Sequence, residues 1–203
     1  MPTPIERPPS LDEEKDRIES IDFPPLTVKF DDVKQTVYVH YPDWTSEITT
    51  DDAKLQFDFN NRMYLSTEQR VNTEKYLKVN LLGGSVSFDV DLSRSGCGCL
   101  TALYAVLMPA SANTDDPFEY CDASKVDGHY CPEFDLMQAN KYAYRATPHR
   151  CDAADSDGNY QSCDHDGQCS VDILLNEDDN DYGPGDIYTI NTEKVFNVDT
   201  RFI

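Results

Sequence analysis

Two acidic residues near position 133 have the type and spacing of a carboxylate pair that carries out chemistry. Glu133 and Asp135 are separated by one residue. Because successive side chains of a β-strand point to opposite faces, a strand here places both carboxylates on the same face. Two carboxylates that close cannot both ionise freely, so the pKa of one rises and the pair suits acid, base or nucleophilic catalysis. Solvated strand faces carry the same spacing, so the pair alone does not establish an active site.

The sequence around this pair resembles a known enzyme family. Glu133-x-Asp135-x-x-Gln138-Ala139-Asn140, followed by residues 146–151, is similar to the active-site strand and the following loop of glycoside hydrolase family 7, the fungal-type cellobiohydrolases and endoglucanases. Other similar motifs follow in order within residues 23–202, at 24–27, 62–65, 81–83, 88–91, 97–98, 102–104, 120–122 and 182–185. The resemblance implies a concanavalin-like β-sandwich, a jelly roll whose concave face holds a β-1,4-glucan.

The resemblance also implies a role for each residue of the motif. Glu133 takes the place of the nucleophile and Asp135 that of the carboxylate that tunes it. Gln138 stands where the family has its acid/base glutamate, and an amide has no proton to give. A retaining glycosidase needs this second carboxyl group, so we expect most activity on natural glucosides to be lost. His149 titrates near neutral pH and is a candidate to replace the missing acid, with a hydrogen bond to the sugar or to a neighbouring carboxylate as the more common role of such a histidine.

Five further residues are candidates for contact with the substrate. Trp44, the only tryptophan, corresponds to a sugar-stacking residue, although a core aromatic residue is an equally simple interpretation. The other four are expected to line the cleft as hydrogen-bonding groups, with a structural role as the alternative for the tyrosines. They are Arg62, Tyr104, Tyr120 and Asp122.

The seven cysteines all lie between Cys97 and Cys169, which indicates local disulfides in the second half of the chain. A zinc site built from Cys97, Cys99, Cys163 and Cys169 is the competing interpretation, but no CxxC pair is present, and we expect no metal and no cofactor. The resemblance implies the pairs Cys121–Cys131 and Cys151–Cys163. Cys97 or Cys99 then remains to bond Cys169 or another protein.

Residues 151–186 are unusually acidic, with eleven Asp and Glu and no Lys or Arg. Oxygen-rich loops of this kind suit Ca²⁺. The spacing does not fit an EF-hand loop around either Gly158 or Gly167, so a solvated acidic loop is the preferred interpretation.

Apolar residues alternate with a period of two in most of the chain, which predicts antiparallel strands. We expect them around residues 36–41, 55–59, 77–81, 85–92, 187–190 and 195–202. Residues 102–108 are continuously apolar and predict a strand covered on both faces. The predicted fold is an all-β, antiparallel sandwich with long disulfide-pinned loops.

Two domains are predicted. Residues 1–25 form a Pro-rich acidic arm with a short helix over residues 11–19, and residues 26–203 form the sandwich. This second region matches only the N-terminal half of the family's catalytic domain. Uncovered sheet edges would then pair with a protein partner or a second copy of the chain.

Composition excludes several classes of function. The net charge of −21 would repel nucleic acid and anionic membrane surfaces. No apolar run is long enough for a membrane span, and no signal peptide is visible in the first thirty residues. The expected disulfides nevertheless indicate a secreted or lumenal oxidising compartment.

The sequence leads to three alternative hypotheses about the function. The first is a degenerate, non-catalytic member of the fold that acts as a structural or binding subunit of an assembly. The second is a non-hydrolytic β-1,4-glucan (cellulose) binding protein. The third is a retaining β-glucanase with Glu133 as nucleophile and Asp135 or His149 as acid.

Overall fold

The computed structural model describes residues 17–18, 20–42, 48–108, 118–126, 128–172 and 181–203. Its regular elements are strands, apart from one short 3-10 helix and a helical pair, Arg17 and Ile18. The chain divides into two compact units, residues 1–78 with 110–119 and residues 79–109 with 120–203. Within the described part of the chain, no helix is long and apolar enough to cross a bilayer. The expected all-β, antiparallel sandwich is confirmed.

The first unit contains a three-stranded antiparallel sheet in the order β1-β2-β5, formed by β1 (Pro25–Phe30), β2 (Val33–His40) and β5 (Tyr64–Ser66). Asp31 and Asp32 join β1 to β2 with positive φ angles of 47° and 65°, as a two-residue hairpin turn requires. A hairpin of β3 (Ile48–Asp51) and β4 (Lys54–Phe57) and the 3-10 helix η1 (Thr73–Lys75) complete the unit. Its core is built around the buried side chains of Leu26, Val37 and Val39.

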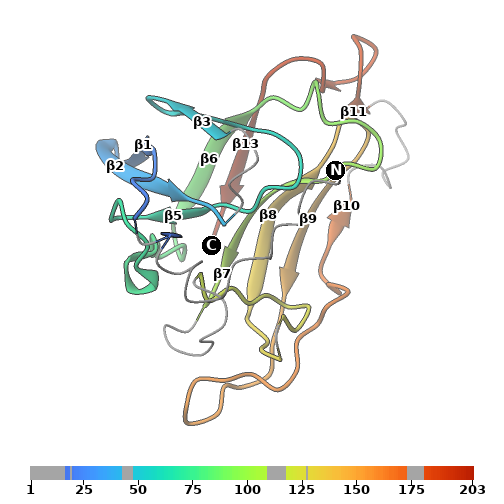
Figure 1. Ribbon diagram of the computed structural model, residues 1–203. Helices are drawn as coiled ribbons and strands as arrows, with labels where there is room; N and C mark the ends of the chain where they lie inside the picture. Colours follow the sequence, from blue (N-terminus) through green and yellow to red (C-terminus); the bar gives the residue numbers. More distant parts are fainter. Residues whose placement is uncertain (1–16, 19, 43–47, 109–117, 127, 173–180) are drawn as a thin grey trace, which may run out of the picture. The chain divides into compact units, whose positions relative to one another are not determined.

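The second unit contains a four-stranded antiparallel sheet, which Figure 1 shows with its strands side by side. The order is β10-β9-β8-β7, from β7 (Thr101–Val106), β8 (Glu133–Ala139), β9 (Tyr144–His149) and β10 (Val171–Asp172). A second layer is the antiparallel pair β6 (Ser85–Val90) and β13 (Phe196–Arg201). The short strands β11 (Tyr182–Gly183) and β12 (Ile190–Asn191) pair in parallel.

Apolar side chains hold the two layers of this unit together. Met137 and Ala139 of β8 pack with Val198 of β13, Leu92 and Tyr182 in one buried cluster. Half-buried residues surround it, among them Phe88, Val90 and Phe196. The alternation in residues 85–92 is therefore the pattern of a strand with one face in the core, as the sequence predicts.

Three strand predictions need correction. Residues 77–81 form no strand: Leu77 packs against the core of the first unit, whereas Val79 is 44% exposed. The strand expected over 187–190 is only β12, since Ile187 lies in an exposed turn. The apolar run at 102–108 is not covered on both faces, because every residue of β7 is half-buried and Leu107 is 62% exposed.

The predicted arm and its helix over 11–19 lie largely outside the described residues, and the domain boundary at residue 25 stays a prediction.

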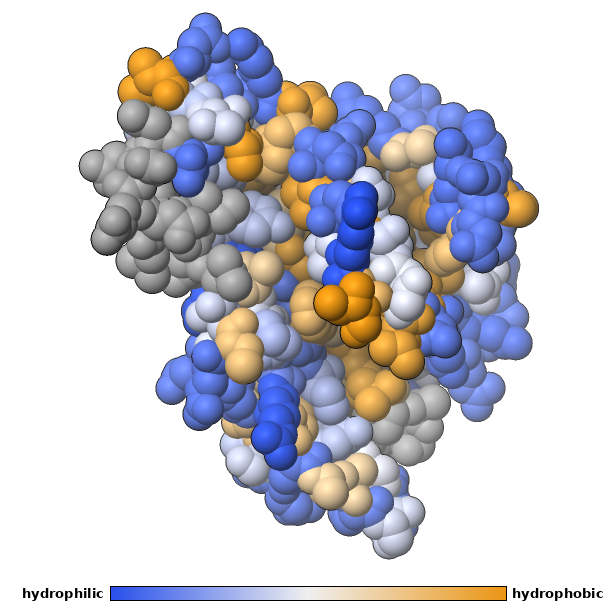
Figure 2. Space-filling model, turned by 180° about the vertical axis from the view of Figure 1, so that it is seen from behind, coloured by the Kyte–Doolittle hydropathy of each residue, from blue (hydrophilic) through white to orange (hydrophobic). Residues whose placement is uncertain are grey.

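On the face shown in Figure 2, hydrophobic residues form small groups between hydrophilic ones, as the high negative charge leads one to expect.

Candidate active site

A β-bulge in β8 places Gln138 on the same face as Glu133. These residues are five positions apart, so a regular strand would point them to opposite faces. The register of β8 against β9 shifts between Asp135 and Gln138, which adds one residue and reverses the alternation. The adjacent apolar residues Leu136 and Met137, both buried, occupy this irregular stretch. The bulge therefore brings the two positions that a retaining glycosidase needs onto one surface.

That surface is the floor of an open cleft in the second unit, with a volume of about 420 Å³. We call it the main cleft. Side chains from β7, β8 and β9 form its floor, and residues from two loops form its wall. The lining residues are Leu100, Ala102, Tyr104, Tyr120, Asp122, Ser124, Glu133, Gln138, Arg145, His149, His165 and Asp166.

Glu133 has the electrostatic surroundings of a group that titrates near neutral pH. Burial raises its pKa to about 7, although the Ala123 N–H donates to its Oε2 at 3.1 Å and opposes that rise. The negative charges of Asp135 and Asp122 raise the pKa further. Glu133 therefore passes between a neutral acid and a nucleophilic carboxylate near physiological pH.

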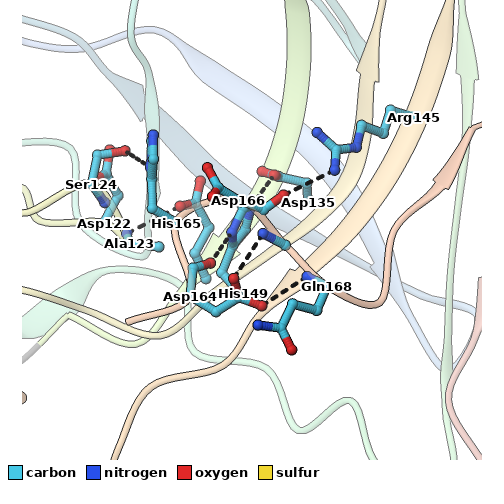
Figure 3. A network of polar contacts seen from close by, with 12 residues as sticks. Asp122, Ala123, Ser124, Asp135, Arg145, His149, Asp164, His165, Asp166 and Gln168 are labelled. Atoms are coloured by element: carbon cyan, nitrogen blue, oxygen red, sulfur yellow. Dashed lines mark hydrogen bonds and ion pairs between the residues drawn. The ribbon is translucent and has the colours of Figure 1, made fainter. Parts of the chain in front are cut away.

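Asp135, two residues from Glu133 on the same face of β8, is fully buried, and His149 holds its carboxylate (Figure 3). His149 Nδ1 lies 2.7 Å from the carbonyl oxygen of Asp164, which can only accept, so Nδ1 carries a hydrogen. Nε2 lies 3.0 Å from Asp135 Oδ2 and shares a proton with it. Burial raises the pKa of Asp135. Burial would lower the pKa of His149, but the Asp164 carbonyl and the Asp135 carboxylate raise it overall.

The contacts of His149 argue against the expectation that it replaces the missing acid. Both of its ring nitrogens are used within the protein, and its side chain is only 10% exposed. A histidine bound in this way has no free nitrogen to protonate a leaving group. Its two contacts are those of a side chain that holds Asp135 in place.

Tyr104, Tyr120 and Asp122 form a hydrogen-bonded group at the wall of the main cleft. The Tyr120 hydroxyl donates to Asp122 Oδ2 at 2.7 Å and lies 3.4 Å from the Tyr104 hydroxyl. Burial and the neighbouring Tyr104 raise the pKa of Tyr120, so its hydroxyl stays protonated. The Ser124 N–H donates to Asp122 Oδ1 at 2.7 Å and fixes the second carboxylate oxygen.

Four polar cleft residues were missed at the sequence level. Ser124 Oγ and His165 Nδ1 are 3.1 Å apart, and Arg145 donates to the Asp166 carbonyl at 3.0 Å (Figure 3). Only Arg145 could have been found from the sequence. A short turn joins β8 to β9, and this hairpin places Arg145 opposite Gln138. His165 and Asp166 reach the cleft on a loop whose path the sequence does not reveal.

The two remaining predicted substrate contacts belong to the first unit. Trp44 lies outside the described residues. Arg62 is exposed. The substrate role of both stays a prediction.

The cysteines form the two disulfides that the family resemblance implies, Cys121–Cys131 and Cys151–Cys163. Cys97, Cys99 and Cys169 are free thiols. Within the described residues, no group of three or more His, Cys, Asp or Glu is placed to hold a metal ion. Two loop carboxylates, Asp155 and Asp164, accept backbone N–H bonds instead.

Gly167 packs directly against the back of the site, and we expect Gly167→Ala to destabilise the fold by about 1–3 kcal/mol more than Gly158→Ala. A Cβ at Gly167 would overlap Thr147 Cγ2 and lie 3.3 Å from His149 Cε1. Both glycines have a positive φ, 70° and 85°, but nothing lies within 4 Å of a Cβ at Gly158. Gly158→Ala thus controls for backbone strain alone. Urea unfolding of the two variants measures the difference, and equal losses would show that the close approach does not matter.

Comparison with known proteins identifies relatives along most of the chain. A model of glycosyl hydrolase family 7 matches residues 112–203. Endoglucanase EG-1 of Trichoderma longibrachiatum is 31% identical over 149 residues, which cover 63% of this chain and 30% of the relative. Endoglucanase type C of Fusarium oxysporum is 29% identical over 193 residues, covering 77% of this chain and 44% of the relative. The chain thus spans less than half the length of these relatives.

Solved structures share the fold. An endoglucanase I complexed with cellobiose superposes with a TM-score of 0.67 at 22% identity, covering 87% of this chain and 64% of that chain. The Humicola insolens endocellulase EGI superposes with a TM-score of 0.57 at 28% identity, covering 70% of this chain and 42% of that chain.

Proposed function

Because the chain is a relative of the endoglucanases of glycosyl hydrolase family 7, we propose that its main cleft binds a β-1,4-glucan and cleaves it poorly. The observation that carries this proposal is Gln138 on the same face of β8 as Glu133, with both side chains lining the cleft. A retaining glycosidase protonates the leaving oxygen with a carboxyl group at that place. The glutamine amide donates a hydrogen bond to the same oxygen but cannot release a proton.

The remaining polar groups of the main cleft support binding of a sugar chain. Tyr104, Asp122 and Arg145 supply both donors and acceptors, as the hydroxyl groups of a pyranose require. The half-buried ring of Tyr104 adds apolar surface for the C–H face of a sugar. A structural relative was solved with cellobiose bound, which agrees with a glucan as ligand.

Calorimetric titration with cello-oligosaccharides tests the binding. The full chain is expected to bind these oligosaccharides and to release no shorter oligosaccharides during the titration. Ser124→Tyr fills the mouth of the cleft at an exposed position and should weaken binding at least about tenfold, whereas Ser124→Ala should not. A wild-type chain that retains no oligosaccharide would refute the proposal.

Glu133 keeps its place as nucleophile in this proposal, and covalent labelling measures its ionisation. An activated 2-fluoro-cellobioside needs no proton donor, because its leaving group departs unassisted. We expect the ester to form on Glu133 and the labelling rate to rise with pH to a plateau, with a midpoint near the pKa of about 7, since only the carboxylate attacks. Mass spectrometry locates the label, and Glu133→Gln is the control. A rate that does not change with pH would contradict the raised pKa.

A second candidate function, that of a subunit in an assembly, is favoured by the edge of the four-stranded sheet. In the described part of the chain, β7 pairs only with β8, and Leu100 and Leu107 at its ends are 66% and 62% exposed. Such an edge accepts a strand from a partner or a second copy. Sedimentation of the native protein checks this, and a stable monomer would count against it.

The two disulfides agree with an oxidising environment. We therefore place the protein in a secreted or lumenal compartment.

A further inference from the structure

A second, smaller cavity lies in the same unit as the main cleft, and nothing in the proposed mechanism uses it. Its volume is about 230 Å³, and we call it the side pocket. Polar and aromatic side chains line it, chiefly Lys125, His129, Tyr130, Asp155, Tyr160 and Gln161. Pockets that enclose drug-sized ligands typically measure ~300–1,000 Å³, so this one suits a single ring.

Two disulfide-closed loops frame the side pocket. Lys125, His129 and Tyr130 come from the loop closed by Cys121–Cys131, and Asp155 and Tyr160 from the loop closed by Cys151–Cys163. Tyr130 and Tyr160 form an antiparallel bridge that joins the loops. Because the covalent links restrict both walls, the pocket is largely preformed, and little ordering entropy opposes binding.

The lining suits a neutral, hydroxyl-rich ring. Tyrosine, histidine and glutamine offer both donors and acceptors, which pyranose hydroxyls require. Lys125 and Asp155 bring opposite charges, so neither an anion nor a cation is favoured. Lys125 Nζ already lies 5.3 Å from the centre of the Tyr130 ring, which leaves Tyr160 as the aromatic surface for the C–H face of a sugar.

The side pocket lies next to the main cleft. Residues of β7, β8 and β9 line the main cleft. Glu133 begins β8 and pairs with His149, which ends β9, and both disulfide loops extend beyond these strand ends. Ser124 lines the main cleft and its neighbour Lys125 lines the side pocket, so a single stretch of loop separates the two.

We propose that the side pocket binds a single pyranose branch of a substituted β-1,4-glucan whose backbone lies in the main cleft. This inference rests on the proposed function and narrows its ligand to branched glucans. In this proposal, a sugar attached to a backbone glucose reaches past Ser124 to Lys125 and the side pocket. An unbranched chain has no group to place in the side pocket.

Titration with two probes tests the inference: a xyloglucan oligosaccharide and the unbranched cello-oligosaccharide with the same backbone length. The wild-type chain is expected to bind the branched probe about tenfold more tightly. Tyr160→Ala should reduce that ratio to about one and leave the affinity for the unbranched probe within about twofold. Gln161→Ala, an exposed position, should reduce the ratio without any effect on folding.

Tyr142→Ala is the matched control, because Tyr142 is an exposed tyrosine that lines neither cavity. It should keep the full preference. Equal affinity for the two probes, or a preference that survives both Tyr160→Ala and Gln161→Ala, would overturn the branch site while leaving glucan binding intact. Failure of the wild-type chain to bind either probe would instead refute the proposed function and, with it, the branch site.

Discussion

Gln138→Glu is expected to raise the hydrolysis of unsubstituted cello-oligosaccharides by ~10²–10⁴-fold. The bulge in β8 already points this side chain toward the same cleft as Glu133. A glutamate there regains the carboxyl proton that departure of a sugar alkoxide requires, and it also activates water in the second step. Chromatography of the products from cellopentaose measures the gain.

Two companion variants make this result specific. Gln138→Asp adds a carboxyl group that is one methylene shorter, so it should recover far less activity. The double variant Glu133→Gln/Gln138→Glu should be inactive, because the nucleophile is gone. If the wild-type chain already cleaved cellopentaose as fast as Gln138→Glu, the role assigned to the amide would be wrong.

The second large effect concerns stability: His149→Ala is expected to lower the free energy of unfolding by ~3–5 kcal/mol. Asp135 is 0% exposed, and His149 is the partner of its Oδ2. Within the described residues, Asp135 Oδ1 has no hydrogen-bond partner. Removal of the imidazole therefore leaves a buried carboxylate without its neutralising partner. Urea unfolding at neutral pH measures the loss.

His165→Ala is the matched control, because His165 is exposed and its imidazole is hydrogen-bonded to Ser124 at the surface. The free energy of unfolding of His165→Ala should stay within about 0.5 kcal/mol of the wild-type value. The His149→Ala deficit should also shrink at acid pH, since a protonated Asp135 needs no counter-charge. Burial raises the pKa of Asp135, so this recovery begins above the ordinary range for aspartate. Equal losses for both histidines, or a deficit independent of pH, would contradict the buried pair.

Local patterns in the sequence predicted many of the strands of the fold. Alternation over residues 85–92 and 195–202 predicted β6 and β13, because one face of each strand packs on the core. The same period over residues 77–81 predicted a strand wrongly: Leu77 packs on the core, but the segment has no ladder with a neighbouring strand in the described residues. The single-residue spacing of Glu133 and Asp135 put them on one face, an arrangement that the structure has.

The sequence by itself determined which residue types the candidate site contains: two carboxylates, Glu133 and Asp135, and the amide of Gln138. Only the tertiary structure decided that a bulge brings Gln138 to the face of Glu133, and that both nitrogens of His149 are bound within the protein. It also decided that residues 165 and 166 reach the cleft. The physical reason is that residue type and strand period act over a few neighbouring positions, whereas strand register and loop path depend on contacts between segments far apart in the chain.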